Sequence, residues 1–415
     1  MSIKIKYFLS AIALIISGVI ITVFLISGSA KNSSPVVNAD EVRAFLTAET
    51  KNPQLETINS RIKFFAEKVQ KDNFGPVTTG MLAGAYSARF GISGDINDLV
   101  TSDSLWKMTG RKYNGTKTSV YQSLSMNSLA RHEFKKSLDY AYNAYLIGEH
   151  KNISEGMIFD AYIETGNYEE ARRLLNSQRN NTEFSYLIRA SKYKEITGDI
   201  DSALIFMSLA LDIAKSNPTR PGLITWTNNS LAAIYIKAEN YGKAYELYLN
   251  SLKLDPNNYK ALEGIAVIAS VNDKNYALAE EILLDLSKRL LSPDPYLNMY
   301  KVAKLQGDNA KKKEYLDKFI TISSDPKYGK MYNKYLAEIS ADEFSDFNKA
   351  LNIAQSEISE RPTPASYFLL AWIYSKQGDY TKAIDIIKNN VEDKTFDPEI
   401  LAKIDRIYLN ETKKM

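Results

Sequence analysis

The sequence predicts an all-α protein, a right-handed α-solenoid of about nine helix pairs preceded by one transmembrane helix. Two observations carry this prediction. An uncharged apolar stretch of membrane-spanning length lies within the first 30 residues, and a short phrase then recurs along the chain with a period near 34 residues. The composition, 45% hydrophobic and 24% charged, is that of a folded chain rather than a disordered one.

The N-terminus has the pattern of a membrane anchor. No charged residue occurs from Tyr7 to Ile26, and Lys4 and Lys6 precede this stretch. About 20 apolar residues span the hydrocarbon core, and the positive-inside rule places the lysines in the cytoplasm. We therefore expect a cytoplasmic tail (1–6), a transmembrane signal anchor (7–28), a spacer (29–39) and an extracytoplasmic body, periplasmic or at the cell surface. A signal peptide cleaved after Ala30 is the alternative, and it exports the same body.

The recurring phrase consists of a turn residue, an aromatic or Ile, two polar residues and a small residue. Gly166 to Ala171 (GNYEEA) is one clear copy, and Gly378 to Ala383 (GDYTKA) is another. Glycine accepts the left-handed conformation that ends a helix, and a small residue three places after the aromatic lets two helices approach closely. The nine copies close at Leu99, Ser137, Ala171, Ala203, Ala244, Ala279, Lys312, Ala350 and Ala383.

The unit from Trp226 to Pro256 is the clearest helix pair. Leu231, Ala232 and Tyr235 share one face of a first helix, and the second helix stops at Asp255-Pro256 because proline cannot continue it. The chain here resembles the tetratricopeptide repeat family, whose pattern is W-x2-L-G-x2-Y followed by A-x3-F, A and P. The resemblance covers about 330 residues and is loosest where Lys312 and Leu99 replace small residues.

This resemblance implies a superhelix whose concave wall, formed by the first helices, binds a protein or peptide. The exposed wall residues would be Asn229, Ala233, Ile236 and Lys237 in one unit and Phe368, Trp372 and Lys376 in the last. Aromatic residues in a groove are typical hot spots, although Trp372 could equally pack against the terminal helix. The lysine and asparagine clamp by which some family members bind chaperone C-termini has no match here.

Both ends of the array have the pattern of caps. We assign 40–396 to the solenoid with its N-terminal capping helices, which include an apolar pattern across residues 40–72, and 397–415 to a C-terminal capping helix. Amphipathic end helices cover the last apolar faces of a solenoid.

The sequence offers little that could carry catalysis. Cysteine is absent, the only histidines are His132 and His150, and no metalloprotease, nucleophile-elbow or phosphate-loop motif occurs. His132 falls on a turn position of the repeat, which favours a structural role. A net charge of +3 argues against nucleic acid as a partner. We therefore expect no enzyme activity, no cofactor and no metal.

The sequence-based functional prediction is a membrane-tethered scaffold that mediates protein–protein interaction on the extracytoplasmic side. The alternative is an accessory subunit in the export or assembly of a polysaccharide or surface protein, in direct contact with that substrate. The identity of the partner, the pathway and the oligomeric state do not follow from the sequence.

Overall fold

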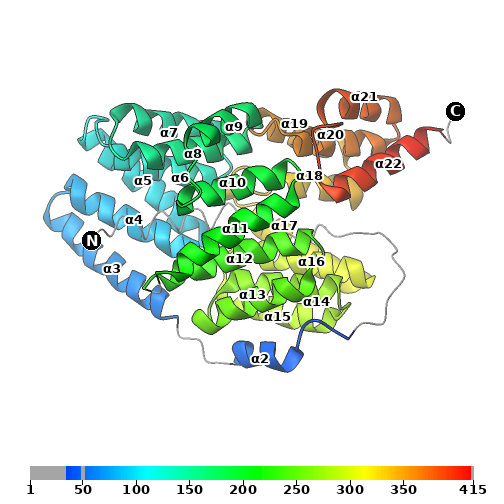
Figure 1. Cartoon of the computed structure of the whole chain (residues 1–415), viewed down its shortest axis with the longest axis horizontal. Helices are drawn as coiled ribbons and strands as arrows, with labels where there is room; N and C mark the ends of the chain where they lie inside the picture. The colour runs from blue at the N-terminus through cyan, green and yellow to red at the C-terminus, as the bar shows by residue number, and fades with distance from the viewer. Residues whose placement is uncertain (1–33, 48–51, 218, 413–415) are drawn as a thin grey trace.

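The computed structural model describes residues 34–47, 52–217 and 219–412, and within these ranges every regular element is a helix (Figure 1). Nine antiparallel helix pairs follow one another along the described chain, as the sequence predicted. The pairs are α4 (Pro76–Ser93) with α5 (Ile96–Lys112), α6 (Thr118–Ala130) with α7 (Phe134–Ile147), α8 (Lys151–Glu164) with α9 (Tyr168–Ser177), α10 (Phe184–Ile196) with α11 (Ile200–Lys215), α12 (Pro221–Lys237) with α13 (Tyr241–Leu254), α14 (Tyr259–Val271) with α15 (Tyr276–Arg289), α16 (Asp294–Gln306) with α17 (Asn309–Ser323), α18 (Asn333–Asp342) with α19 (Phe347–Glu360), and α20 (Pro364–Gln377) with α21 (Tyr380–Asn390).

The phrase that recurs in the sequence forms the turn inside each pair. Its first residue has a positive φ, 72° at Gly166 and 78° at Gly307. The Asp or Asn that follows often caps the second helix, as Asn240 does by accepting a hydrogen bond from the backbone N–H of Lys243 at 3.2 Å. The small residue then packs between helices: Ala171, Ala203, Ala244, Ala279, Ala350 and Ala383 are all fully buried. Lys312 departs from this rule, and its Nζ reaches Glu343 at 2.8 Å.

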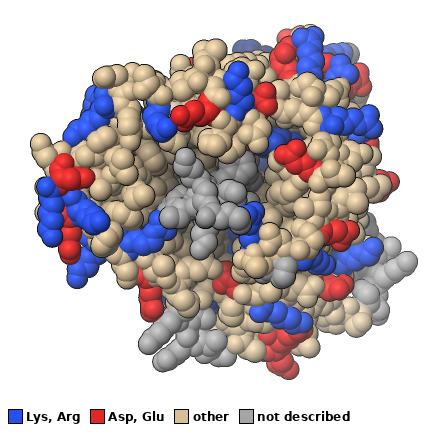
Figure 2. Space-filling view, turned by 60° about the vertical axis from the view of Figure 1, so that its left-hand side comes forward, with Lys and Arg blue, Asp and Glu red and all other residues tan. Residues whose placement is uncertain are grey.

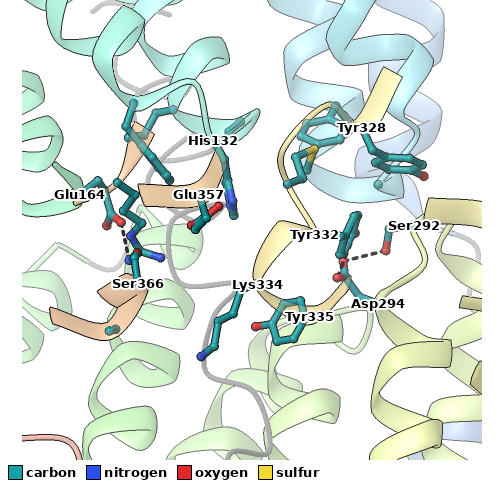
Figure 3. Close-up of a pocket in the computed structure, with 18 of the residues that line it drawn as sticks. His132, Glu164, Ser292, Asp294, Tyr328, Tyr332, Lys334, Tyr335, Glu357 and Ser366 are labelled. Carbon is teal, nitrogen blue, oxygen red and sulfur yellow. Dashed lines mark hydrogen bonds and ion pairs between the residues drawn. The ribbon is translucent and has the colours of Figure 1, made fainter. Parts of the chain in front are cut away.

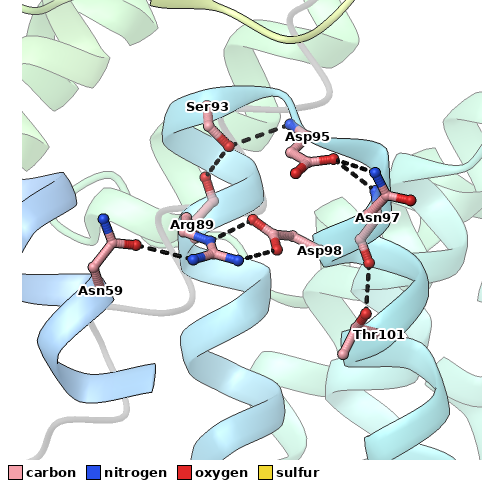
Figure 4. Close-up of polar contacts among 7 residues, drawn as sticks. All are labelled: Asn59, Arg89, Ser93, Asp95, Asn97, Asp98 and Thr101. Atoms are coloured by element: carbon pink, nitrogen blue, oxygen red, sulfur yellow. Dashed lines mark hydrogen bonds and ion pairs between the residues drawn. The ribbon is translucent and has the colours of Figure 1, made fainter. Parts of the chain in front are cut away.

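An arginine hydrogen-bonds across the first helix pair (Figure 4). The Arg89 guanidinium on α4 donates two hydrogen bonds to Asp98 on α5, at 2.6 and 2.7 Å, and one to Asn59 at 3.0 Å. Asn59 lies on α3 (Pro53–Lys71), so one side chain ties three helices together. The pairing raises the pKa of Arg89 through its hydrogen bonds to Asp98.

A helix packs on each end of the array of pairs, whereas the N-terminal segment packs on its middle. α22 (Pro398–Thr412) packs on α21, and α3 packs on α4. α2 (Ala39–Thr47) does not extend this N-terminal cap: it lies beside α13–α15, in the middle of the array (Figure 1). The Asp273 carboxylate accepts the backbone N–H groups of Val36 and Val37 at 2.9 and 2.8 Å, and Val42 is fully buried.

The solenoid curls back so that turns of its first half touch loops of its second half. A Cβ added to Gly94 would lie 2.9 Å from Ser292, one added to Gly166 would lie 2.7 Å from the Pro362 carbonyl oxygen, and one added to Gly198 would lie 2.6 Å from the Phe396 ring. A backbone hydrogen bond from Leu291 to Ser93, 2.7 Å long, belongs to the first of these contacts. The superhelix is therefore closed on itself rather than open along its length.

The surface and the expected anchor complete the description. On the face shown in Figure 2, acidic and basic side chains are interspersed, in keeping with the nearly balanced charge of the sequence. The expected transmembrane helix, residues 7–28, and most of the spacer lie outside the described residues. Among the helices that the structure does describe, none is both long enough and apolar enough to cross a bilayer.

Candidate functional site

A cavity of about 250 Å³ lies where the two halves of the superhelix meet (Figure 3). Its borders include the turn after α6, the end of α8 and the start of α14. The loop before α16, the loop after α17 and the helices α18 to α20 complete the lining. Its lining combines tyrosines with ionisable side chains: Tyr259, Tyr328, Tyr332, Tyr335, His132, Glu164, Lys260, Asp294, Lys334, Glu357 and Arg361. A concave site with convergent polar groups and aromatic walls is the usual form of a ligand site.

One wall of the cavity is an ion cluster that joins the two halves of the chain. The Arg361 Nη2, in the loop before α20, lies 2.7 Å from the Glu164 carboxylate at the end of α8. Lys192 on α10 lies 3.3 Å from the same carboxylate. Burial alone would raise the pKa of Glu164, but Arg361 and Lys192 outweigh it and hold that pKa below its usual range. Glu164 is therefore ionised at neutral pH and anchors the closure.

His132 stands next to this cluster. The residue adopts a φ of 58° at the turn between α6 and α7, as its place in the repeat predicted. Its ring stacks on Phe134 with centroids 5.1 Å apart, and the Arg361 guanidinium lies over the same Phe134 ring at 5.5 Å. Burial, and then the charge of Arg361, lower the pKa of His132 to about 4. The imidazole is neutral at physiological pH and forms part of the cavity wall.

Glu357 on α19 is the most unusual side chain of the cavity. It is only 4% exposed, and its carboxylate takes part in no hydrogen bond or ion pair with any described residue. Figure 3 shows it pointing into the space beside His132. Burial raises the pKa of Glu357, and the charges of Arg361 and Lys334 oppose that effect. A buried carboxylate with no partner is costly, so its position in a cavity calls for an explanation.

The opposite wall is aromatic, and Asp294 is its hydrogen-bonded acid. Asp294 accepts a hydrogen bond from the Tyr332 hydroxyl at 3.0 Å and another from the Ser292 hydroxyl at 2.9 Å. Burial, and then Asp294, raise the pKa of Tyr332 well above its ordinary value. The Lys301 Nζ lies over the Tyr335 ring at 4.6 Å, and burial lowers the pKa of Lys301 to about 7. This wall thus holds neutral aromatic surface next to a lysine that loses its charge readily.

The first set of predicted groove residues, on α12, is only partly exposed. Ala233 is 5% exposed because α12 packs on its neighbours there, which corrects our expectation that it lines an open groove. Asn229 donates a hydrogen bond to Asn258 at 2.9 Å, and the half-buried Ile236 packs against the central core. Lys237 is exposed, and its Nζ contacts Glu195 on α10. The set therefore presents mainly Lys237 to a partner.

The second set lies on α20. Phe368 is 5% exposed in the C-terminal core and so is not on a free surface, contrary to expectation. Trp372 is half-buried: its indole N–H donates to Asp342 at 3.1 Å, and Lys376 and Lys403 lie over its ring at 5.4 and 5.1 Å. Since Lys403 belongs to α22, Trp372 does contact the terminal helix, while its other edge remains accessible.

Sequence reasoning missed the cavity but could have found Glu357. Seven places after the small residue of the second helix, other repeats carry Ala144, Ala210, Ser251 or Leu286, all fully or almost fully buried. Glu357 occupies that same place after Ala350. A charged residue at a position that packs in the other repeats is the signal. As for metals, the described residues contain no group of three or more His, Cys, Asp or Glu side chains that could hold an ion.

The nine stacked helix pairs define the chain as an α-solenoid repeat protein. Its sequence matches models of the tetratricopeptide repeat at residues 227–258 and 366–399, the units of α12–α13 and α20–α21. These two helix pairs are therefore tetratricopeptide repeats. No curated protein matches its sequence closely enough to count as a relative.

Similar solved structures include two tetratricopeptide-type solenoids. One is the crystal structure of the APC/C hetero-tetramer Cut9–Hcn1, at 15% identity over 91% of each chain with a TM-score of 0.35. The other is the human IFIT1 dimer with PPP-AAAA, at 13% identity over 79% of this chain and 76% of that one, with a TM-score of 0.47. Both are too distant for conclusions about function.

Proposed function

We propose that the protein is a membrane-tethered tetratricopeptide scaffold that binds a protein partner on the extracytoplasmic side, without catalytic activity. The observation that carries this proposal is the pair of tetratricopeptide repeat matches, because arrays of this repeat serve as protein-binding surfaces. The apolar stretch at residues 7–28 supports the tether. Docking of residues 34–47 on α13–α15 supports a body held close to that tether.

The accessible part of the predicted groove is the edge of α20. Trp372 and Lys376 stand side by side there, and an aromatic ring next to a cation is a frequent anchor for a partner. We expect Trp372→Ala combined with Lys376→Ala to abolish crosslinking of a specific partner to the full-length protein in native membranes. Lys135→Ala, at an exposed lysine on α7, is the matched control and should keep the partner. An unchanged partner profile in the double variant would disprove binding at α20.

The tether and its orientation have a separate test. Protease added to intact cells should digest the body if it lies at the cell surface. If the body is periplasmic, digestion should begin once the outer layer is opened. A tag at residue 1 should stay protected in both cases. Deletion of residues 1–30 should release a soluble, strongly helical protein from the membrane fraction. Protection of the body with digestion of the tag would reverse the orientation, and continued sedimentation with membranes would exclude this stretch as the sole anchor.

A role as an accessory subunit that contacts a polysaccharide or surface-protein substrate directly is the second candidate. The cavity favours it, because tyrosine rings next to carboxylates suit a polar ligand with apolar faces. The crosslinked preparation distinguishes the two functions: capture of a protein partner supports the scaffold, and capture of a glycan supports the accessory subunit.

A further inference from the structure

The cavity contains one unmatched hydrogen-bond acceptor. Glu357 is only 4% exposed as a residue, its carboxylate makes no described hydrogen bond or ion pair, and its side chain lines the cavity beside His132 (Figure 3). The neighbouring acids are matched differently, because Glu164 is paired with Arg361 and Lys192, and Asp294 is hydrogen-bonded to Tyr332 and Ser292. Only Glu357 among these three acids lacks a partner in the described structure.

A donor beside Glu357 is also unmatched, the Nε–H of Arg361. Arg361 uses its Nη2 on Glu164, while its Nε–H is buried and finds no acceptor. Arg361 follows Glu357 by four residues, immediately after α19 ends, and both line the cavity. A ligand that satisfies both groups carries a hydrogen-bond donor for the Glu357 carboxylate and an acceptor for the Arg361 Nε–H.

Charge and size narrow the ligand class. A buried carboxylate is satisfied best by a cation, and the Glu357 carboxylate has no cation within ion-pair distance among the described residues. A metal ion would need more ligands than the described site offers. A volume of 250 Å³ exceeds the roughly 150 Å³ that accommodates benzene and fits about ten non-hydrogen atoms.

We propose that the cavity binds a small molecule that carries a primary ammonium group next to an oxygen acceptor, with Glu357 as counter-ion and the Arg361 Nε–H as donor to that oxygen. Free α-amino acids and amino sugars share this chemistry. The site goes beyond the scaffold function, since it lies inside the closed superhelix and not on the α20 edge where a protein partner is proposed to bind.

Binding is tested by isothermal titration calorimetry of the full-length protein in detergent at pH 7, with serine and glucosamine as probes and their N-acetylated forms as controls. Acetylation removes the positive charge and keeps the oxygens. We expect at least one free amine to bind, with its acetylated form weaker by about thirtyfold or more, since leaving one member of a buried charge pair alone has at least this effect. Binding of serine alone assigns an amino-acid ligand, and binding of glucosamine alone assigns an amino sugar.

Two variants decide whether Glu357 is the counter-ion. Glu357→Gln should lose the affinity of the free amine by about thirtyfold or more, yet keep or raise the melting temperature of the unliganded protein, because an unpaired buried charge is removed. Glu360→Gln, on the same helix but paired with Lys330 at 2.9 Å, should leave the affinity unchanged. A Glu357→Gln protein that melts well below the wild type would show a structural role and overturn the proposal.

The proposal also fails if neither amine binds, or if free and acetylated forms bind equally. Neither result bears on the crosslinking experiment at α20, because Trp372 and Lys376 lie outside the cavity lining. Failure of the ligand site and failure of the scaffold function are therefore distinguishable.

Discussion

The closure of the superhelix can be tested at a single glycine with a matched control elsewhere in the chain. Gly166 and Gly307 occupy equivalent turns, with φ values of 72° and 78°. A Cβ on Gly166 would lie 2.7 Å from the Pro362 carbonyl oxygen, whereas a Cβ on Gly307 would have no described neighbour within 4 Å. The pair Gly166→Ala and Gly307→Ala therefore separates backbone strain from loss of the contact between the two halves.

The expected magnitudes follow from these two terms. The left-handed conformation costs alanine about 1–2 kcal/mol at either site. At Gly166 the clash with backbone adds about 1–3 kcal/mol, as overpacking of a tight contact does. We expect Gly307→Ala to lower the free energy of unfolding by about 1–2 kcal/mol and Gly166→Ala by about 2–5 kcal/mol. The difference between the two losses in free energy of unfolding measures the contact between the two halves of the chain. Pro362 belongs to that contact because it is next to Arg361, which pairs with Glu164.

Urea unfolding of both full-length variants, followed by circular dichroism, gives the two values. Small-angle scattering provides a second readout, since a weakened closure should enlarge the radius of gyration only in Gly166→Ala. Equal destabilisation of the two variants, with equal radii, would refute the contact between the turn after α8 and the loop before α20.

Three further predictions concern the core, the cavity and the N-terminal segment. Ala244→Asp places an unpaired charge at a fully buried site and should lower the free energy of unfolding by about 3 kcal/mol or more; an unchanged thermal melt would show that the repeat is phased wrongly. In the folded protein the pKa of His132 is lowered to about 4. Between about pH 6.5 and about pH 4 the unfolded chain therefore binds one proton more than the folded chain, so the free energy of unfolding falls over this window by about 3 kcal/mol at most. His132→Asn, which tolerates the left-handed turn, should flatten urea-unfolding stability across this pH range, and an unchanged slope would contradict a neutral buried imidazole. Asp273→Ala removes the acceptor of two backbone N–H groups, so hydrogen exchange at residues 36 and 37 should accelerate at least tenfold, while exchange at the wild-type rate would mean that this segment is held by other contacts.

The sequence predicted the helix pairs because the information for each pair is local. A turn residue, an aromatic and a small residue lie within six positions, so Gly166 to Ala171 can be recognised without knowledge of the rest of the chain. The closure has no such local signal. It depends on small rotations between successive pairs that accumulate along the array, and Gly166 meets Pro362 only after this accumulation. Gly307 occupies the equivalent turn and has no such contact.

The same reasoning explains the errors in the groove. Ala233 and Phe368 were placed on an open wall because an isolated helix pair exposes that face of its first helix. In the array the face is covered by neighbouring pairs, and both residues are 5% exposed. Lys237 and Trp372 keep part of their surface because their long or polar side chains reach past the packed region to Glu195 and Asp342.

Glu357 shows where departures from the repeat carry information. At its position five of the other second helices bury an uncharged residue, namely Ala144, Ala210, Ser251, Leu286 and Phe319. A carboxylate there removes apolar contact and adds the cost of an unpaired charge, and the Arg361 next to it is already committed to Glu164. Sequences that fold tend to break such a local rule mainly at functional sites, where a ligand supplies what the fold lacks. The deviation, the cavity and the missing partner therefore have one explanation in common, which is a bound cation at Glu357.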